Sequence, residues 1–140
     1  YSPDLKLYDV VLAKDAYSES TYAKTMGVSS RKKLPATKTL NNRLMKTAEK
    51  LGIPITAGTI HSSDVFYRNH FDDYKEIFAK HDAIAVEMES FALFANAKQL
   101  GKKAACLLTV SDSLVTHEAT TSKERQEAFT KMMEIALNSL

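Results

Sequence analysis

The stretch from Ala83 to Leu100 constrains the fold most, because its hydrophobic periodicity changes within a few residues. It begins with the continuous apolar run Ala83–Val86, which is typical of the end of a buried strand. Beyond that run, apolar side chains recur at helical spacing, and they are Met88, Phe91, Ala92 and Ala95. The sequence therefore predicts a buried strand that passes almost directly into a helix.

Two carboxylates, Glu87 and Glu89, lie at this junction. A structural interpretation accounts for them, because carboxylates in a first helical turn interact favourably with the helix dipole. A functional interpretation is also open, since open α/β sheets bind ligands beyond the carboxyl ends of their strands. There the two carboxylates would accept hydrogen bonds from vicinal hydroxyls, and Met88 between them would supply an apolar contact. The junction alone does not decide between the two.

The rest of the chain alternates between strand and helix patterns. Strands are predicted over residues 7–12, 55–60 and 104–110, and helices are predicted to begin at Thr39, Asp72 and Thr121. Gly52 is expected to end the first helix, and a capping box of Thr121 and Glu124 to start the last. The expected inward face of that last helix consists of Arg125, Ala128, Phe129, Met132, Ala136 and Leu140. This alternation predicts an α/β domain with a largely parallel sheet.

The composition fits one globular domain of 140 residues, 44% of them hydrophobic. A formal charge of +2 is too close to balance to indicate nucleic-acid binding, and no apolar run reaches the roughly 18 residues that a membrane-spanning helix needs. The single cysteine, Cys106, excludes an intrachain disulfide and suits a reducing cytoplasm. Residues 18–33 are expected to form a long surface excursion. Because a strand pattern follows Tyr1 almost at once, we expect the chain to begin inside a larger protein.

Asp112 follows the predicted strand 104–110, where burial would raise the pKa of its carboxyl and let it hold a proton. A loop or helix cap is the structural alternative. Arg125 falls on the otherwise apolar face of the last helix, and a charge on a buried face usually has a partner. We therefore predict an Asp112–Arg125 ion pair. Such a pair lowers the pKa of the aspartate, so an acid role requires strong burial or an arginine that engages only during turnover.

Phe66 and Tyr67 follow the predicted strand 55–60 and would suit the wall of a site for a flat ring, although aromatic residues in such places are more often part of the core. No metal site is predicted, because the four histidines lack metal-ligand spacing. A glycine-rich phosphate loop and a G-x-S-x-G motif are also missing.

Three blocks carry a resemblance to a known family. They are S-S-D-V-F-Y at 62–67, A-V-E-M-E-S-F-A at 85–92 and T-V-S-D-S-L-V-T-H-E-A-T-T-S-K-E-R-Q at 109–126. In order and spacing they resemble the hexameric purine nucleoside phosphorylases of bacterial type, and the last block is the specific one. The resemblance implies a three-layer α/β fold, with a mixed, mostly parallel sheet flanked by helices. It implies that residues 1–140 form a single domain, the carboxyl-terminal part of a subunit that here lacks its amino-terminal part.

The resemblance also implies roles for residues at the junction. Phe66 would pack against the base and the sugar. Val86 and Met88 would line the nucleoside pocket, Glu87 would lie beside the base, and Glu89 would bind the ribose 2′- and 3′-hydroxyls.

The remaining implied roles concern the purine. Ser111 and Asp112 would face N7 and the 6-substituent, Asp112 would donate a proton to N7, and Arg125 would assist that donation. The resemblance further implies cleavage of purine (deoxy)ribonucleosides by inorganic phosphate in a cytoplasmic homohexamer, with no cofactor. The family's phosphate-binding residues, and those lent by a neighbouring subunit, match nothing in this sequence.

Alternatives remain open at this stage. A uridine phosphorylase or a hydrolytic nucleosidase would share much of the pattern, although a carboxyl donor such as Asp112 suits the N7 of a purine. A noncatalytic nucleoside-binding fragment is the alternative from a different class.

Overall fold

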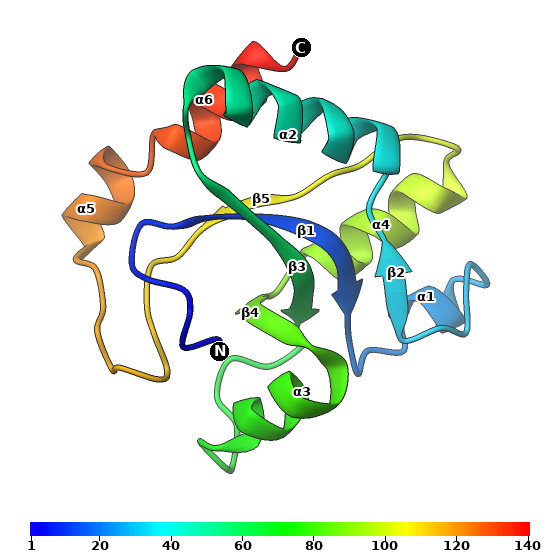
Figure 1. Ribbon diagram of the computed structural model, residues 1–140. Helices are drawn as coiled ribbons and strands as arrows, with labels where there is room; N and C mark the ends of the chain where they lie inside the picture. The colour runs from blue at the N-terminus through cyan, green and yellow to red at the C-terminus, as the bar shows by residue number, and fades with distance from the viewer.

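The computed structural model describes residues 1–140 as a five-stranded mixed sheet with six helices around it (Figure 1). The strands are β1 (Val10–Tyr17), β2 (Lys33–Pro35), β3 (Ile55–Ser62), β4 (Ala83–Glu87) and β5 (Leu107–Thr109). The helices are α1 (Tyr22–Thr25), α2 (Lys38–Leu51), α3 (Asp73–His81), α4 (Ser90–Gln99), α5 (Ser122–Glu127) and α6 (Lys131–Asn138). None of these helices is both long enough and apolar enough to cross a membrane.

Strand β1 organises the sheet, because three other strands pair with it. It runs parallel to β3, and β3 runs parallel to β4. The other edge of β1 is shared by two short antiparallel strands, β5 beside its first half and β2 beside its second half. The carboxyl ends of the three parallel strands therefore meet at one edge of the sheet, where α/β proteins bind ligands.

Alternate residues of β1 point to opposite faces, as the two-residue period of a strand requires. Val10 and Leu12 pack with Leu44 and Ala48 of α2 and with Ile135 of α6. The opposite face belongs to a larger cluster that includes Val11, Ala13, Ile60, Phe91 and Phe94. Figure 1 shows α2 and α6 on one side of the sheet and α4 on the other. The three-layer α/β architecture predicted from the sequence is thus confirmed.

Two strand predictions need correction. The first strand begins at Val10 rather than at residue 7 and continues to Tyr17, because a shift in register between Ala13 and Asp15 accommodates the polar Lys14 without ending the strand. The strand predicted over 104–110 is only three residues long, half-buried and antiparallel to β1. The alternation of patterns indicated the elements but could not give their direction.

The excursion predicted over residues 18–33 is also more than surface loop. It contains the short helix α1, whose Ala23 is buried in the core cluster beside α4. It leads directly into β2. This segment therefore contributes to the fold rather than only covering it.

The last helix differs most from its prediction. The capping box of Thr121 and Glu124 is present, but the helix ends at Glu127, and α6 begins at Lys131. The interruption resets the helical phase, so the buried residue of α6 is Ile135, whereas Ala136 and Leu140 are exposed. Arg125, predicted to face the core, is exposed as well, because α5 contributes no buried residue.

The role of Ile135 can be tested by mutation. Ile135 is fully buried between α2 and β1, so Ile135→Ala should leave a cavity and lower the free energy of unfolding by roughly 2–4 kcal/mol. Leu137→Ala is the matched control, since Leu137 lies on the same helix but is 69% exposed, and it should change stability by less than about 0.5 kcal/mol. Urea unfolding of the two variants makes the comparison. Similar losses in both would contradict this packing of α6.

Candidate functional site

A cleft of about 890 Å³ opens beside the carboxyl ends of β3 and β4. Three segments line most of it: the aromatic segment that follows β3, residues 85–88 at the end of β4, and residues 108–114 at and beyond β5. Seven of the eight predicted site residues line it, namely Phe66, Val86, Glu87, Met88, Ser111, Asp112 and Arg125. Glu89 does not. The structure thus brings together residues that are up to 59 positions apart in the sequence, from 66 to 125.

The aromatic segment (residues 65–71) forms one wall of the cleft. Phe66 is 77% exposed and Tyr67 is 90% exposed, and the two rings contact each other edge-on with centroids 5.0 Å apart. The interpretation of these rings as core residues is therefore wrong. Phe71, also exposed, stacks on the ring of His117 at 5.8 Å. Adjacent aromatic side chains left in solvent beside a cleft are typical of a binding surface.

At the strand-to-helix junction, Glu87 acts as the helix-capping carboxylate that the structural interpretation predicted. Its Oε2 atom accepts hydrogen bonds from the backbone N–H groups of Glu89 at 2.8 Å and Ser90 at 2.7 Å, and its Oε1 atom accepts one from Ser90 Oγ at 2.5 Å. Glu87 thereby caps the first turn of α4. It also lines the cleft, so the two interpretations are compatible for this residue.

Glu89 is exposed and lies outside the lining of the cleft. Its Oε2 atom accepts a hydrogen bond from the backbone N–H of Met88 at 3.2 Å. Val86 and Met88, each 40% exposed, present the apolar contacts at this end of β4.

Asp112 and Arg125 lie in the same cleft without pairing. Asp112 accepts a hydrogen bond from Ser111 Oγ at 2.5 Å through Oδ2, and its backbone forms a bridge with Ala119. Arg125 instead donates to the backbone oxygen of Thr120 at 2.5 Å and to Ser122 Oγ at 3.2 Å. The predicted ion pair is therefore wrong for this structure. Asp112 is also exposed, so the burial that was expected around it is not present.

A polar network centred on the buried His61 was not predicted from the sequence. His61, at the end of β3, has no exposed surface. Its Nε2 atom lies 2.7 Å from Glu19 Oε2, and its Nδ1 atom lies 2.8 Å from the hydroxyl of Tyr1. The second oxygen of Glu19 accepts a hydrogen bond from Arg68 Nη2 at 2.7 Å. Arg68 also donates to Ser63 Oγ at 3.2 Å.

The protonation states in this network follow from its environment. Burial lowers the pKa of the His61 imidazole, although Glu19 acts in the opposite direction, so the ring is neutral at pH 7. Burial also acts to raise the pKa of Glu19, but hydrogen bonds from His61 and Arg68 outweigh it and lower that pKa to about 2. Burial raises the pKa of the Tyr1 hydroxyl to about 12. Tyr1 therefore donates to Nδ1, while Nε2–H of His61 donates to the Glu19 carboxylate.

A pH series tests this assignment. In the unfolded chain His61 takes up a proton near its ordinary pKa, whereas in the folded chain it resists protonation. The unfolded state thus binds more protons as the pH falls below about 6.5, and the free energy of unfolding should fall by up to about 1.4 kcal/mol per pH unit. Urea unfolding at pH 7.5, 6.5 and 5.5 should show this slope in the wild type and in His70→Gln, a control at an exposed histidine. His61→Gln should lack it, and an unchanged slope in His61→Gln would refute the assignment.

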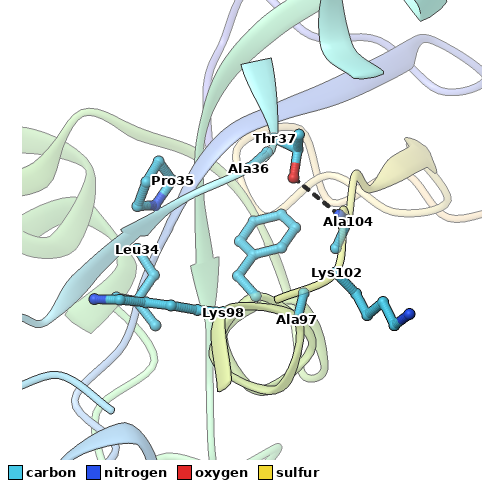
Figure 2. A pocket seen from close by; sticks show the side chains of 9 residues that line it. Leu34, Pro35, Ala36, Thr37, Ala97, Lys98, Lys102 and Ala104 are labelled. Atoms are coloured by element: carbon cyan, nitrogen blue, oxygen red, sulfur yellow. Dashed lines mark hydrogen bonds between the residues drawn. The ribbon is translucent and has the colours of Figure 1, made fainter. Parts of the chain in front are cut away.

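A second cavity, of about 220 Å³, lies between β2 and α4 (Figure 2). Most of its lining is apolar, and Thr37 Oγ1 already accepts a hydrogen bond from the backbone N–H of Ala104 at 2.9 Å. Figure 2 shows the amino groups of Lys98 and Lys102 extending away from it on opposite sides. Because no polar groups converge there, the larger cleft is the candidate site.

Two features besides the cleft residues bear on the chemistry of the chain, namely metal-ligand clusters and the single cysteine. No cluster of three or more His, Cys, Asp or Glu side chains is arranged to hold a metal ion. Burial raises the pKa of the Cys106 thiol to about 12, which keeps it protonated and unreactive at neutral pH. The polar groups that line the cleft include the carboxylates of Glu87 and Asp112, the hydroxyl of Ser111 and the guanidinium groups of Arg68 and Arg125.

The fold and the cleft together define an α/β protein with a candidate small-molecule site at the carboxyl ends of its parallel strands. Residues 1–140 match the family described as the Phosphorylase superfamily, and the chain belongs to that superfamily.

The chain is similar to curated relatives from two Mycoplasma species. The chain is 46% identical over 138 residues to the DeoD-type purine nucleoside phosphorylase of Mycoplasma genitalium and 43% identical over 135 residues to that of Mycoplasma pneumoniae. These alignments cover 97% and 95% of this chain but only 58% and 56% of the relatives' own lengths. The chain therefore spans little more than half the length of the curated relatives it matches.

Solved structures share the fold. A purine nucleoside phosphorylase from Toxoplasma gondii superimposes with a TM-score of 0.80 at 23% identity, covering 97% of this chain and 56% of that one. A futalosine hydrolase mutant of Helicobacter pylori superimposes with a TM-score of 0.74 at 18% identity, covering 99% of this chain and 61% of that one. At these identities the likeness concerns the fold alone.

Proposed function

We propose that this chain forms the nucleoside-binding part of a purine nucleoside phosphorylase. That enzyme would convert a purine (deoxy)ribonucleoside and inorganic phosphate into the free base and (deoxy)ribose 1-phosphate. The observation that carries the proposal is the meeting of Asp112, the exposed Phe66 ring and the end of β4 in one cleft. The identities of 46% and 43% to DeoD-type purine nucleoside phosphorylases support it.

Asp112 is the proton donor in this proposal. Cleavage of an N-glycosidic bond builds positive charge on the sugar and negative charge on the departing base. Protonation of the base makes it a better leaving group, and general acid catalysis of this kind is typically worth about 10²–10⁴-fold. Ser111 Oγ holds Oδ2 of Asp112, whereas Oδ1 makes no hydrogen bond and is free for the purine.

Arg125 would assist the proton transfer from Asp112 after a local rearrangement. Arg125 lines the cleft, and its guanidinium is bound to the backbone oxygen of Thr120 and to Ser122 Oγ. Release of these two contacts would let it approach Asp112 when a nucleoside is bound.

The end of β4 would hold the nucleoside. Val86 and Met88 expose apolar surface for the ring systems, and Phe66 lines the same cleft as part of the aromatic wall. Glu87 is a fixed acceptor, because the first turn of α4 orients both of its oxygens. Glu89 would turn toward the cleft to bind the ribose hydroxyls, exchanging its contact with the N–H of Met88.

The site for phosphate is not assigned to any residue of this chain. Arg68, the cation within the aromatic segment, is already bound to Glu19 and Ser63. Inorganic phosphate as the co-substrate, a homohexameric assembly and a cytoplasmic location remain part of the proposal, supported by the resemblance to the bacterial enzymes.

A phosphorolysis assay tests the proposed function. We expect the protein that contains this chain to release hypoxanthine from inosine only when phosphate is present. Release without phosphate would instead identify a hydrolytic nucleosidase, and release of uracil from uridine a uridine phosphorylase. Binding of inosine by calorimetry without any release would identify a noncatalytic nucleoside-binding protein.

A substitution at Asp112 tests the proposed acid. Asp112→Asn keeps the shape of the side chain but removes the transferable proton, so kcat for inosine should fall about 10²-fold or more while KM changes little. Glu127→Gln, at an exposed carboxylate of α5 outside the cleft, is the control and should leave both constants unchanged. Equal losses in kcat and in inosine affinity would argue against the acid role.

A further inference from the structure

The aromatic wall of the cleft makes few hydrogen bonds that hold it in place. It lies between β3 and α3 in a stretch without helix or strand. Four of its hydrophobic side chains are half or more exposed, namely Val65, Phe66, Tyr67 and Phe71. Between Phe66 and Asn69, the only hydrogen bonds are those made by the side chain of Arg68. Arg68 is therefore the polar anchor of the segment that carries Phe66.

Glu19 holds that anchor from another part of the chain. It follows β1, and its Oε1 atom accepts the hydrogen bond from Arg68 at 2.7 Å. A second carboxylate, Asp73, is more distant from the guanidinium, at 3.8 Å. A charge-assisted hydrogen bond at 2.7 Å is among the stronger polar contacts in proteins, so Glu19 fixes the position of Arg68 more than any other residue does.

His61 in turn fixes Glu19. The imidazole is fully buried, and its Nε2–H donates to Glu19 Oε2 at 2.7 Å, so both carboxylate oxygens have defined partners. The ring of Tyr17 packs on the imidazole with centroids 5.8 Å apart, and the hydroxyl of Tyr1 holds its other nitrogen. The rigid end of β3 is thus connected through Glu19 to the exposed segment at the cleft.

We propose that Glu19 and His61 are positioning residues, which act through Arg68 to hold the aromatic wall in the geometry that binds the nucleoside base. This inference rests on the proposed function, because the wall matters only if it contacts the substrate. Neither Glu19 nor His61 lines the cleft. A loss of substrate affinity on mutation of either residue therefore cannot come from a lost direct contact.

The test combines a structural readout with a kinetic one. Glu19→Ala should free the aromatic segment, so that chymotrypsin cleaves after Phe66, Tyr67 or Phe71 about tenfold faster, the effect expected when a charge-assisted hydrogen bond is lost. Mass spectrometry locates the cleavage sites. In the same variant KM for inosine should rise about tenfold with kcat nearly unchanged, because the wall binds the base but does not transfer the proton.

Two further variants complete the comparison. Glu76→Ala is the matched control, since Glu76 also pairs with a cation, Lys80, but on the exposed face of α3, and it should alter neither readout. Glu19→Gln keeps acceptor and donor groups in place without the charge and should give intermediate values. It also serves as the test variant if Glu19→Ala fails to fold by circular dichroism.

Each outcome decides the proposal. Faster cleavage together with a raised KM in the Glu19 variants supports it. Unchanged cleavage overturns it, whatever happens to KM, and so does faster cleavage with an unchanged KM. If the wild type releases no base, the proposed function fails separately. Inosine affinity by calorimetry then replaces KM, and an affinity that is unchanged or absent overturns the positioning role as well.

Discussion

Strand β1 is the constraint on which the rest of the structure depends. Its residues 10–13 are buried on both faces, and its edges are shared by β3, β2 and β5. Burial on both faces requires helices on both sides of the sheet, which α2 with α6 and α4 provide. Parallel pairing with β3, and of β3 with β4, brings three carboxyl ends to one edge. Glu19, His61 and Glu87 lie at or just beyond those ends, so both the cleft and the buried network follow from the pairing of β1.

The cleft and the network behind it have opposite physical characters. The cleft exposes aromatic and apolar side chains, which is unfavourable in water unless a ligand covers them. The network is built on the fully buried imidazole of His61, which must keep its hydrogen-bond partners because an unsatisfied buried polar group is costly. His61 satisfies this requirement with one partner on each ring nitrogen. The exposed wall is thus attached to a part of the protein with little freedom to rearrange.

Much of the fold could be predicted from periodicity. The strand-to-helix junction at residues 83–100, the helix that ends at Gly52 and the Thr121–Glu124 capping box are all present, because each depends on local sequence. The antiparallel direction of β5 and the break between α5 and α6 could not be predicted, since both depend on tertiary packing. For the same reason Arg125 proved to be exposed, and its predicted ion pair with Asp112 is not formed.

The candidate site, like the fold, could be predicted only in part from the sequence. Seven of its eight predicted residues share the cleft. Positions at strand ends and on a helix face had already singled out Phe66, Glu87, Met88, Asp112 and Arg125. The motif resemblance added Val86 and Ser111 and supplied the individual roles. The His61–Glu19–Arg68 network could not be predicted from the sequence, because Glu19 and His61 are 42 positions apart and no motif contains both. The one available signal was a histidine at the end of an apolar strand, which is compatible with many roles.

The central claim is that Asp112 and the aromatic wall act on the same purine. A crystal structure of the protein with inosine bound tests it most directly. The account predicts the base between Phe66 and the end of β4, with N7 within about 3 Å of a carboxylate oxygen of Asp112 and the ribose hydroxyls directed toward Glu89. A nucleoside bound outside this cleft, or one bound within it with N7 directed away from Asp112, would contradict the account.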